Sequence, residues 1–265
     1  MGARDSPDMP IDPAEVADFV RALPLAVDAG FAGFILGFPR KYLAETPRAE
    51  VVKHYALAGS LGTRPVISSL GRSGALWKLC VITRDRRFLF SRIAGALSCS
   101  GMDIVAAEAF ANASALVLDT FRFRDDDGRF EQSATRRRFQ VFLEDAVEGK
   151  VELEPLLRER LGRLPPLSRL EVEMEDEPAR GATRLRLEGP DRFGLLYLSS
   201  RRISEAGADI ELAAIDTAGG RVRDEFLLSR AGGPLGVEGR SEVIRALAGL
   251  AVVKGPAAES RTAAS

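Results

Sequence analysis

Hydrophobic residues along the chain follow two spacings, which predict strands and helices in a definite order. Leu76 to Thr83 is a short apolar run rich in β-branched residues, which is typical of a strand. Apolar residues then recur at the spacing of one helix face from Leu89, and Gly101 is a residue type that commonly closes a helix. The elements expected next are strands over 103–111 and 116–123 and a helix over 139–147.

The second half of the chain predicts the same order. The expected elements are a strand over 183–188, a helix over 194–206, strands over 209–217 and 221–229, a helix over 241–250 and a closing strand over 251–253. A further apolar run, 167–174, predicts a strand whose sheet partner the sequence does not indicate. The order βαββαβ is typical of the ferredoxin-like class of α+β folds, so we expect two such units in tandem.

Two stretches, 81–105 and 187–211, carry the repeat in their residues as well. An offset of 106 positions superposes Asp85 on Asp191, Arg86 on Arg192, Leu89 on Leu195, Gly101 on Gly207, Asp103 on Asp209 and Ile104 on Ile210. We interpret this agreement as an internal duplication. A four-stranded unit with helices on one face leaves open edges, so we expect the units to pair with each other or with a second chain.

Before the first repeat, the sequence predicts a short helical segment. Asp12 and Pro13 are typical of a helix start, because Asp caps the free N–H groups and Pro suits the first helical position. A second helix or loop is expected over the apolar stretch 25–38, and a third helix from Thr46-Pro47 to about residue 61. Gly, Ser and Pro residues make 59–74 a predicted linker.

These patterns predict three parts of the chain. Residues 1–75 form the helical segment and linker, 76–163 the first unit, and 164–265 the second unit. The last residues, from Gly255 to Ser265, are rich in Ala and Ser, and we expect them to be mobile.

The composition limits which binding partners and which cellular compartment we expect for this protein. The chain has 265 residues, 37 of them basic and 38 acidic, so its net charge of −1 predicts no general attraction to nucleic acid or to an anionic membrane. Cys80 and Cys99 do not form a CxxC motif and predict neither a disulfide framework nor a zinc site. The N-terminus is polar, and the most apolar stretch, 27–38, is too short to span a bilayer. We expect a soluble, cytoplasmic protein.

The Asp-Arg-x-x-Leu loop of each copy, the following helix, the Gly, and the Asp-Ile strand start resemble the ACT domains, which sense small molecules in amino-acid metabolism. The Asp-x-Phe strands Asp119-Thr120-Phe121 and Asp224-Glu225-Phe226 fit the same pattern. The tandem copies, together with the stretch from Phe38 to His54, resemble the C-terminal regulatory region of the bacterial PII uridylyltransferase/uridylyl-removing family. The resemblance covers about residues 35–250. It implies a regulatory protein of nitrogen or amino-acid metabolism that senses a small amino acid, with glutamine first among the candidates.

The catalytic domains of that family are not expected here. They carry a Gly-Ser pair followed by metal-binding carboxylates and an HD phosphohydrolase site with several His-Asp ligands. This chain has one histidine, His54, and Gly71 to Gly74 is not followed by such carboxylates. Asp125-Asp126-Asp127-Gly128 lacks the later Glu of a calcium loop. We therefore expect no catalytic residue, no metal site and no cofactor.

Ligand chemistry is expected at the loop that leads into each helix. The free N–H groups of a helix start suit a carboxylate, glycine allows close approach, and an Asp at the next strand can accept from an ammonium group. The main predicted site is in the second copy and consists of Asp191, Arg192, Gly194, Leu195, Asp209 and Ile210. The weaker site is in the first copy and consists of Asp85, Arg86, Leu89, Asp103 and Ile104, because Arg87-Phe88 places a bulky ring where a ligand would approach.

Other interpretations remain open at this level. The chain could be a ligand-free interaction or dimerisation module, or the regulatory subunit of a separate uridylyltransferase. A residual uridylyltransferase or hydrolase is a third alternative, which the missing catalytic residues disfavour. We expect a homo-oligomer formed through the ACT sheets and a signalling protein as a possible partner.

Overall fold

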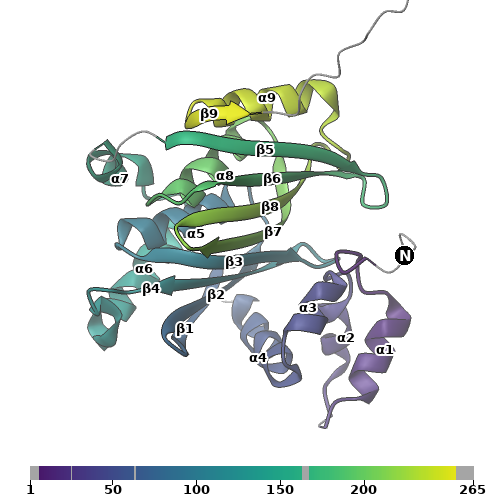
Figure 1. The fold of residues 1–265 in the computed structure, drawn as a ribbon. Coiled ribbons are helices and arrows are strands. Elements are labelled where there is room, and N and C mark those ends of the chain that lie inside the picture. The colour runs from purple at the N-terminus through teal and green to yellow at the C-terminus, as the bar shows by residue number, and fades with distance from the viewer. Residues whose placement is uncertain (1–5, 25, 63, 163–166, 255–265) are drawn as a thin grey trace, which may run out of the picture.

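The computed structural model describes residues 6–24, 26–62, 64–162 and 167–254. In this part of the chain, nine strands form one sheet in the order β1-β2-β4-β3-β7-β8-β6-β5-β9 (Figure 1). The strands are β1 (Val66–Ser73), β2 (Leu76–Arg84), β3 (Asp103–Ala111), β4 (Leu116–Arg124), β5 (Leu167–Glu177), β6 (Ala182–Pro190), β7 (Asp209–Ala218), β8 (Arg221–Ser229) and β9 (Ala251–Lys254). Neighbours are antiparallel, except that β9 lies parallel to β5. The tail predicted to be mobile lies outside the described residues.

The predicted α+β class and tandem ferredoxin-like units are confirmed, with one difference in how each unit is completed. The strand beside the first strand of each unit comes from the segment that precedes it: β1 pairs with β2, and β5 pairs with β6. The partner of the predicted strand 167–174 is therefore β6. The linker prediction for 59–74 is wrong, because a short 3₁₀ helix (Gly59–Gly62) and β1 lie there. Strand β1 is an edge strand with Ser, Gly and Arg positions, so its apolar pattern is weak.

The two units share the sheet through their second strands. β3 pairs with β7 from Ala106 opposite Asp216 to Ala109 opposite Ala213. Each unit thereby covers an edge that the other would expose. The expected pairing between units occurs within this one chain.

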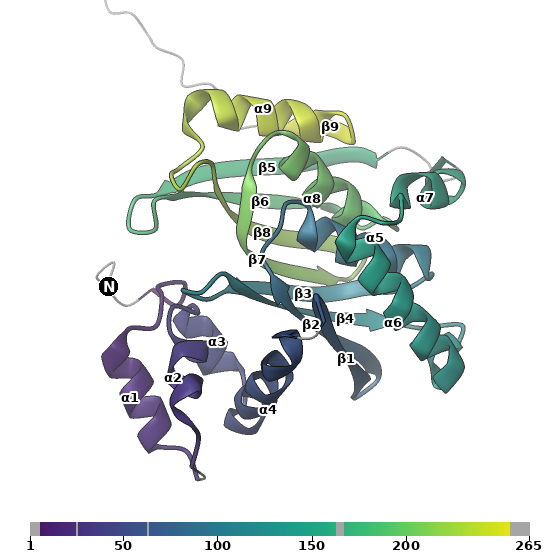
Figure 2. The same cartoon turned by 180° about the vertical axis from the view of Figure 1, so that it is seen from behind.

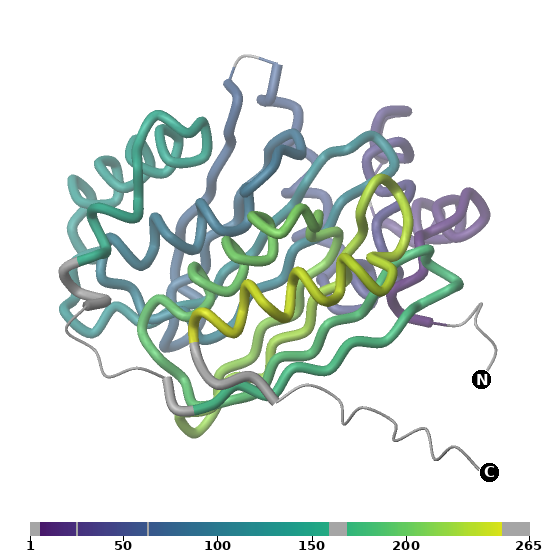
Figure 3. Tube along the Cα trace, turned by 90° about the horizontal axis from the view of Figure 1, so that it is seen from above, coloured from purple at the N-terminus to yellow at the C-terminus, as the bar shows by residue number. Residues whose placement is uncertain are grey.

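One layer of helices covers one face of the sheet (Figure 2). It consists of α5 (Leu89–Cys99), α6 (Ser133–Glu148), α7 (Leu153–Gly162), α8 (Leu195–Glu205) and α9 (Gly236–Ala248). α5 lies against α8, and α9 lies beside α8 (Figure 3). Gly95 lets α5 approach α8 closely, since a Cβ at this position would lie 2.8 Å from both Leu153 Cδ1 and Tyr197 Cδ2. α9 begins five residues before the predicted start at Ser241.

The N-terminal helices pack on the other face, over the first unit. They are α1 (Pro13–Arg21), α2 (Ala29–Ile35), α3 (Arg40–Glu45) and α4 (Arg48–Ala58), which confirms the predicted helical segment. Asp12 caps α1 and forms a capping box with Glu15, as its position predicts. Alternate strand residues divide between the two layers: Leu79 and Val81 face the main helix layer, and Ile82 packs with the N-terminal helices.

Candidate functional site

The two repeat loops lead into α5 and α8 through a residue in the left-handed region. Phe88 has φ 67° before α5, and Gly194 has φ 76° before α8. Neither helix start is capped by a side chain. Glycine adopts this conformation without strain, whereas a phenylalanine there is uncommon. The first N–H group of each helix bonds within its loop, from Leu89 N to the Arg86 carbonyl oxygen at 3.1 Å and from Leu195 N to the Arg192 carbonyl oxygen at 3.0 Å.

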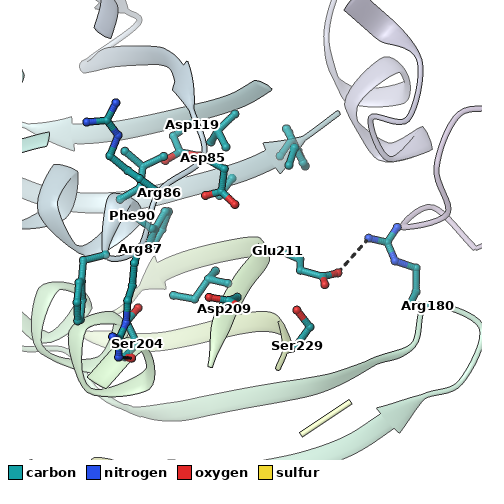
Figure 4. Close-up of a pocket in the computed structure, with 17 residues that line it drawn as sticks. Asp85, Arg86, Arg87, Phe90, Asp119, Arg180, Ser204, Asp209, Glu211 and Ser229 are labelled. Carbon is teal, nitrogen blue, oxygen red and sulfur yellow. Dashed lines mark hydrogen bonds and ion pairs between the residues drawn. The ribbon is translucent and has the colours of Figure 1, made fainter. Parts of the chain in front are cut away.

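Each loop faces a cavity whose opposite wall belongs to the other repeat. The first cavity, of about 310 Å³, lies between the Asp85–Phe90 loop and the Asp209–Glu211 strand start (Figure 4). The second cavity, of about 30 Å³, lies between the 191–196 loop and the strand start at Asp103 and Ile104. A volume of about 300 Å³ is at the lower end for small-molecule sites, and about 30 Å³ suits one or two waters.

The structure groups the predicted site residues crosswise. Asp209 and Ile210 lie with Asp85, Arg86 and Leu89 of the first copy. Asp103 and Ile104 lie instead with the second-copy residues, which are Asp191, Arg192, Gly194 and Leu195. The predicted sets are thus not brought together as written, because β3 pairs with β7 and each loop faces the strand start of the other repeat.

The difference in volume follows from a few side chains. Ala109 and Ala111 line the first cavity, whereas Ile215 and Thr217 occupy the corresponding positions in the second. Phe193 packs against the core beside the second cavity. Arg87 occupies the corresponding position in the first copy, and its Nη2 donates to the Ser204 carbonyl oxygen at 3.0 Å.

The larger cavity therefore lies at the loop whose Phe88 was expected to obstruct it. Phe88 does line this cavity, but its ring also stacks beneath the Arg87 guanidinium, whose carbon lies 4.8 Å from the ring centre. The ring thus stands where it was expected, in the wall of the site, and a cavity of about 310 Å³ remains beside it. The left-handed backbone at Phe88 and the small residues on β3 leave space beside the ring.

Four carboxylates from both repeats line the first cavity, those of Asp85, Asp119, Asp209 and Glu211 (Figure 4). Asp119 is 1% exposed, and neither of its carboxylate oxygens has a hydrogen-bond partner among the described residues. Burial, and next the charge of Asp85, raise the pKa of Asp119 well above its ordinary value. Burial and the charge of Asp209 likewise raise the pKa of Asp85. Charged carboxylates here are poorly compensated, which favours a ligand or a proton beside them.

The second cavity has a matching set of acids. Burial and the charge of Asp191 raise the pKa of Asp224, the counterpart of Asp119. Burial, followed by the charge of Asp103, also raises the pKa of Asp191, while Arg124 acts to lower it. The three aspartates of the first cavity, Asp85, Asp119 and Asp209, thus have counterparts in the second cavity, which are Asp191, Asp224 and Asp103.

The N-terminal segment reaches the rim of the first cavity. Arg180 lines this cavity and donates from Nη1 to the carbonyl oxygen of Asp8, while its Nη2 lies 4.0 Å from Glu211 Oε2. The Asp8 carboxylate accepts from Arg184 Nη2 at 2.7 Å. Asn112, at the β3–β4 turn, donates to the Phe34 carbonyl oxygen at 2.8 Å. The helical segment therefore contacts both repeats beside the cavity.

Several residues of this site were missed from sequence. Asp119 was noticed as part of an Asp-x-Phe strand, without a role at the cavity. Ala109 and Ser229 could have been found by comparing the two copies position by position, since the counterpart of each is larger. No local signal predicts Arg180, because its contacts with Asp8 and Glu211 are made across distant parts of the chain.

Metal and membrane chemistry find no support in the described residues. No group of three or more His, Cys, Asp or Glu side chains in this part of the chain could hold a metal ion. None of the helices that the structure describes has the length and hydropathy needed to cross a bilayer.

Fold and site together define a tandem ferredoxin-like protein with two cavities between its repeats. No family model matches the chain. It is similar to the bifunctional uridylyltransferase/uridylyl-removing enzyme of Azospirillum brasilense, with 29% identity over 80% of this chain and 23% of that enzyme. The enzyme of the same name from Phenylobacterium zucineum is 31% identical over 72% of this chain and 21% of its own length. The enzyme of the same name from Rhodospirillum rubrum is 30% identical over 57% of this chain and 17% of its own length.

These relatives confirm the resemblance that the repeat motifs predict. The chain spans about a fifth of the length of the curated relatives it matches. The activity of the whole enzymes therefore reaches this chain only as a proposal.

Proposed function

We propose that the chain is a non-catalytic regulatory module of nitrogen signalling, which senses a small amino acid in the first cavity. The observation that carries this proposal is a cavity of about 310 Å³ that joins the α5 start of one repeat to the Asp209 strand start of the other. The similarity to uridylyltransferase/uridylyl-removing enzymes supports the nitrogen-signalling context. Glutamine is the first candidate ligand, on the strength of that resemblance.

The chemistry of the cavity suits an α-amino acid. The uncapped start of α5 can receive a carboxylate through backbone N–H groups and the positive end of the helix dipole. Asp85 and Asp209 can accept hydrogen bonds from the ammonium group. The site that we propose is therefore at the loop of the first copy, and it retains Asp209 and Ile210 from the set expected in the second copy.

Regulation would follow from the position of the cavity between the repeats. A ligand held by both walls binds better to the arrangement that brings them to the right distance, and couplings of this kind are typically about 1–3 kcal/mol. The helical segment, which contacts both walls, is placed to respond. A signalling protein or a second copy of the chain, in the cytoplasm, would receive that response.

Calorimetric titration of the purified chain with the twenty amino acids tests the proposal. We expect saturable binding of one ligand per chain, and we expect Ala109→Ile to abolish it by filling the cavity. Thr217→Val changes the second cavity instead and is the matched control that should retain binding.

Two outcomes contradict this proposal. The absence of a heat or thermal-shift response to all twenty amino acids would favour an interaction module without a ligand. Transfer of uridylyl groups to a PII protein, on incubation with UTP and magnesium, would show that the chain is an enzyme.

A further inference from the structure

The two repeats differ in one charged residue beside the strand-start aspartate. At the second cavity, Asp103 pairs across the strands with Arg124, whose Nη1 lies 2.6 Å from Asp103 Oδ2. At the first cavity, the corresponding cross-strand pair is Asp209 with Ser229. The chain thus supplies a guanidinium beside the Asp103 carboxylate, and a hydroxyl beside that of Asp209.

The acids that surround Ser229 are the same as those that surround Arg124. Asp85 and Asp119 correspond to Asp191 and Asp224. Arg124 acts to lower the pKa of Asp191, which keeps that carboxyl nearer its charged form. Asp85 has its own like-charged neighbour, Asp209. The first cavity therefore has counterparts of the three aspartates at the second cavity, together with Glu211, and the serine of the cross-strand pair in place of Arg124.

The arginines that line the first cavity do not replace the missing cation. Arg87 donates to the Ser204 carbonyl oxygen and stacks on Phe88. Arg180 is held between the Asp8 carbonyl oxygen and Glu211. Arg86 lies in the wall of this cavity, and its guanidinium points away from Asp85 and Asp209 (Figure 4).

We propose that the ligand of the first cavity is a small organic cation of net positive charge, whose guanidinium or primary ammonium group lies between Asp85 and Asp209. The group takes the place that Arg124 occupies beside Asp103. This inference rests on the ligand site of the proposed function and replaces glutamine as its first candidate, because glutamine carries no net charge. The buried Asp119, which has no hydrogen-bond partner among the described residues, gives the cavity a third aspartate to receive N–H donors.

The residues beside the two strand-start aspartates also differ in exposure. The Arg124 and Asp103 side chains are about half exposed, at 51% and 42%, so this pair contributes little to stability. Ser229 is 4% exposed and lines the first cavity. With serine at this position, Asp209 has no arginine as its cross-strand neighbour, and the serine itself lines the cavity.

Calorimetry with four probes tests the inference: methylguanidinium, agmatine (decarboxylated arginine), L-arginine and L-glutamine. We expect the three cationic probes to bind, with agmatine at least about tenfold tighter than L-glutamine. Asp209→Asn should weaken agmatine binding about tenfold or more. Asp103→Asn makes the same change at the second cavity and should leave it unchanged.

Ser229→Arg supplies the missing side chain and should abolish binding of the cationic probes. Far-ultraviolet circular dichroism and thermal unfolding show whether the Ser229→Arg protein folds. If this variant does not fold, the comparison of Asp209→Asn with Asp103→Asn tests the inference. Retained agmatine affinity in a folded Ser229→Arg protein, or equal losses in Asp209→Asn and Asp103→Asn, would overturn the inference.

The probes also separate this inference from the proposed function. Binding of L-glutamine without a response to the cations would overturn the ligand class and leave amino-acid sensing intact. No binding of any of the four probes overturns the cationic class, and the wider amino-acid titration then decides the proposed function independently.

Discussion

Arg180 binds Asp8, a residue 172 positions earlier, and lies at the rim of the first cavity. This contact joins the segment before α1 to the turn between β5 and β6. The start of α3 binds the residues on either side of Asp8: the Pro7 carbonyl oxygen accepts from Lys41 N at 2.7 Å, and the Met9 carbonyl oxygen accepts from Arg40 N at 2.8 Å. The segment around Asp8 is therefore a bridge between the N-terminal helices and the second repeat.

Arg180→Ala is expected to loosen this bridge. The side chain is 16% exposed, and a hydrogen bond from a charged donor typically contributes about 1.5–3 kcal/mol. Hydrogen exchange should show faster exchange at residues 7–12 and little change in β2 and β4. Arg169→Ala removes an arginine with a 49% exposed side chain from the same repeat and is the control. Unchanged protection in Arg180→Ala would mean that Arg184 and the bonds from Arg40 N and Lys41 N hold the segment without it.

Asp119→Asn should change how stability depends on pH. The pKa of Asp119 is raised in the folded protein above the ordinary 3.8, so the protonated group favours folding below that value, and this contribution is lost as the pH rises through the folded pKa. The asparagine of the variant does not ionise, so the variant does not lose this contribution to stability as the pH rises. Thermal unfolding between pH 4 and 8 should show that its stability relative to the wild type improves as pH rises. Asp126→Asn, in the exposed 125–128 loop, is the control; parallel curves for wild type and Asp119→Asn would contradict the prediction.

Ile215→Ala should enlarge the second cavity and destabilise the protein. Ile215 is 6% exposed and packs in the main core, and truncation of a buried isoleucine to alanine costs about 2–5 kcal/mol. Urea denaturation measures the loss. Val141→Ala provides the comparison, because Val141 is 61% exposed and should change stability by less than about 0.5 kcal/mol. A small loss in Ile215→Ala would show that the site collapses around the truncated side chain.

Gly95→Ala should disturb the contact between α5 and α8. The added Cβ would lie 2.8 Å from Tyr197 Cδ2 and from Leu153 Cδ1, and overpacking of this kind costs about 1–3 kcal/mol. Gly33, in α2, has no atom within 4 Å of an added Cβ, so Gly33→Ala should stabilise by up to about 1 kcal/mol through helix propensity. Thermal unfolding of both variants gives the comparison. The prediction fails if the two changes have the same sign.

Much of the fold could be predicted because it depends on local patterns. The helix stripe that starts at Leu89 and the hairpin turn at Asn112 appear in the sequence as spacing and turn residues. The strand β1 did not, since an edge strand with Ser68, Ser69 and Gly71 carries little apolar pattern. Its pairing with β2 is decided by the sheet.

The candidate site was predictable in its parts and not in its grouping. The Asp-Arg loops and the Asp-Ile strand starts are visible as residues, and the duplication marks them as related. Whether Asp209 lies with Asp191 or with Asp85 depends on which strands pair between the repeats. The pairing of β3 with β7 places it with Asp85, and no local spacing could show this.

The sequence by itself determined the duplication, the α+β class, the helical segment and the acids of both loops, because these depend on neighbours along the chain. The tertiary structure alone decided which copy has room for a ligand. The cavity depends on Ala109 and Ser229, which line it together with the 85–90 loop of the first repeat and the strand start at Asp209 of the second. The copy with the irregular loop, Arg87-Phe88, has the larger cavity, because volume is set by every side chain that faces it and not by the loop motif alone.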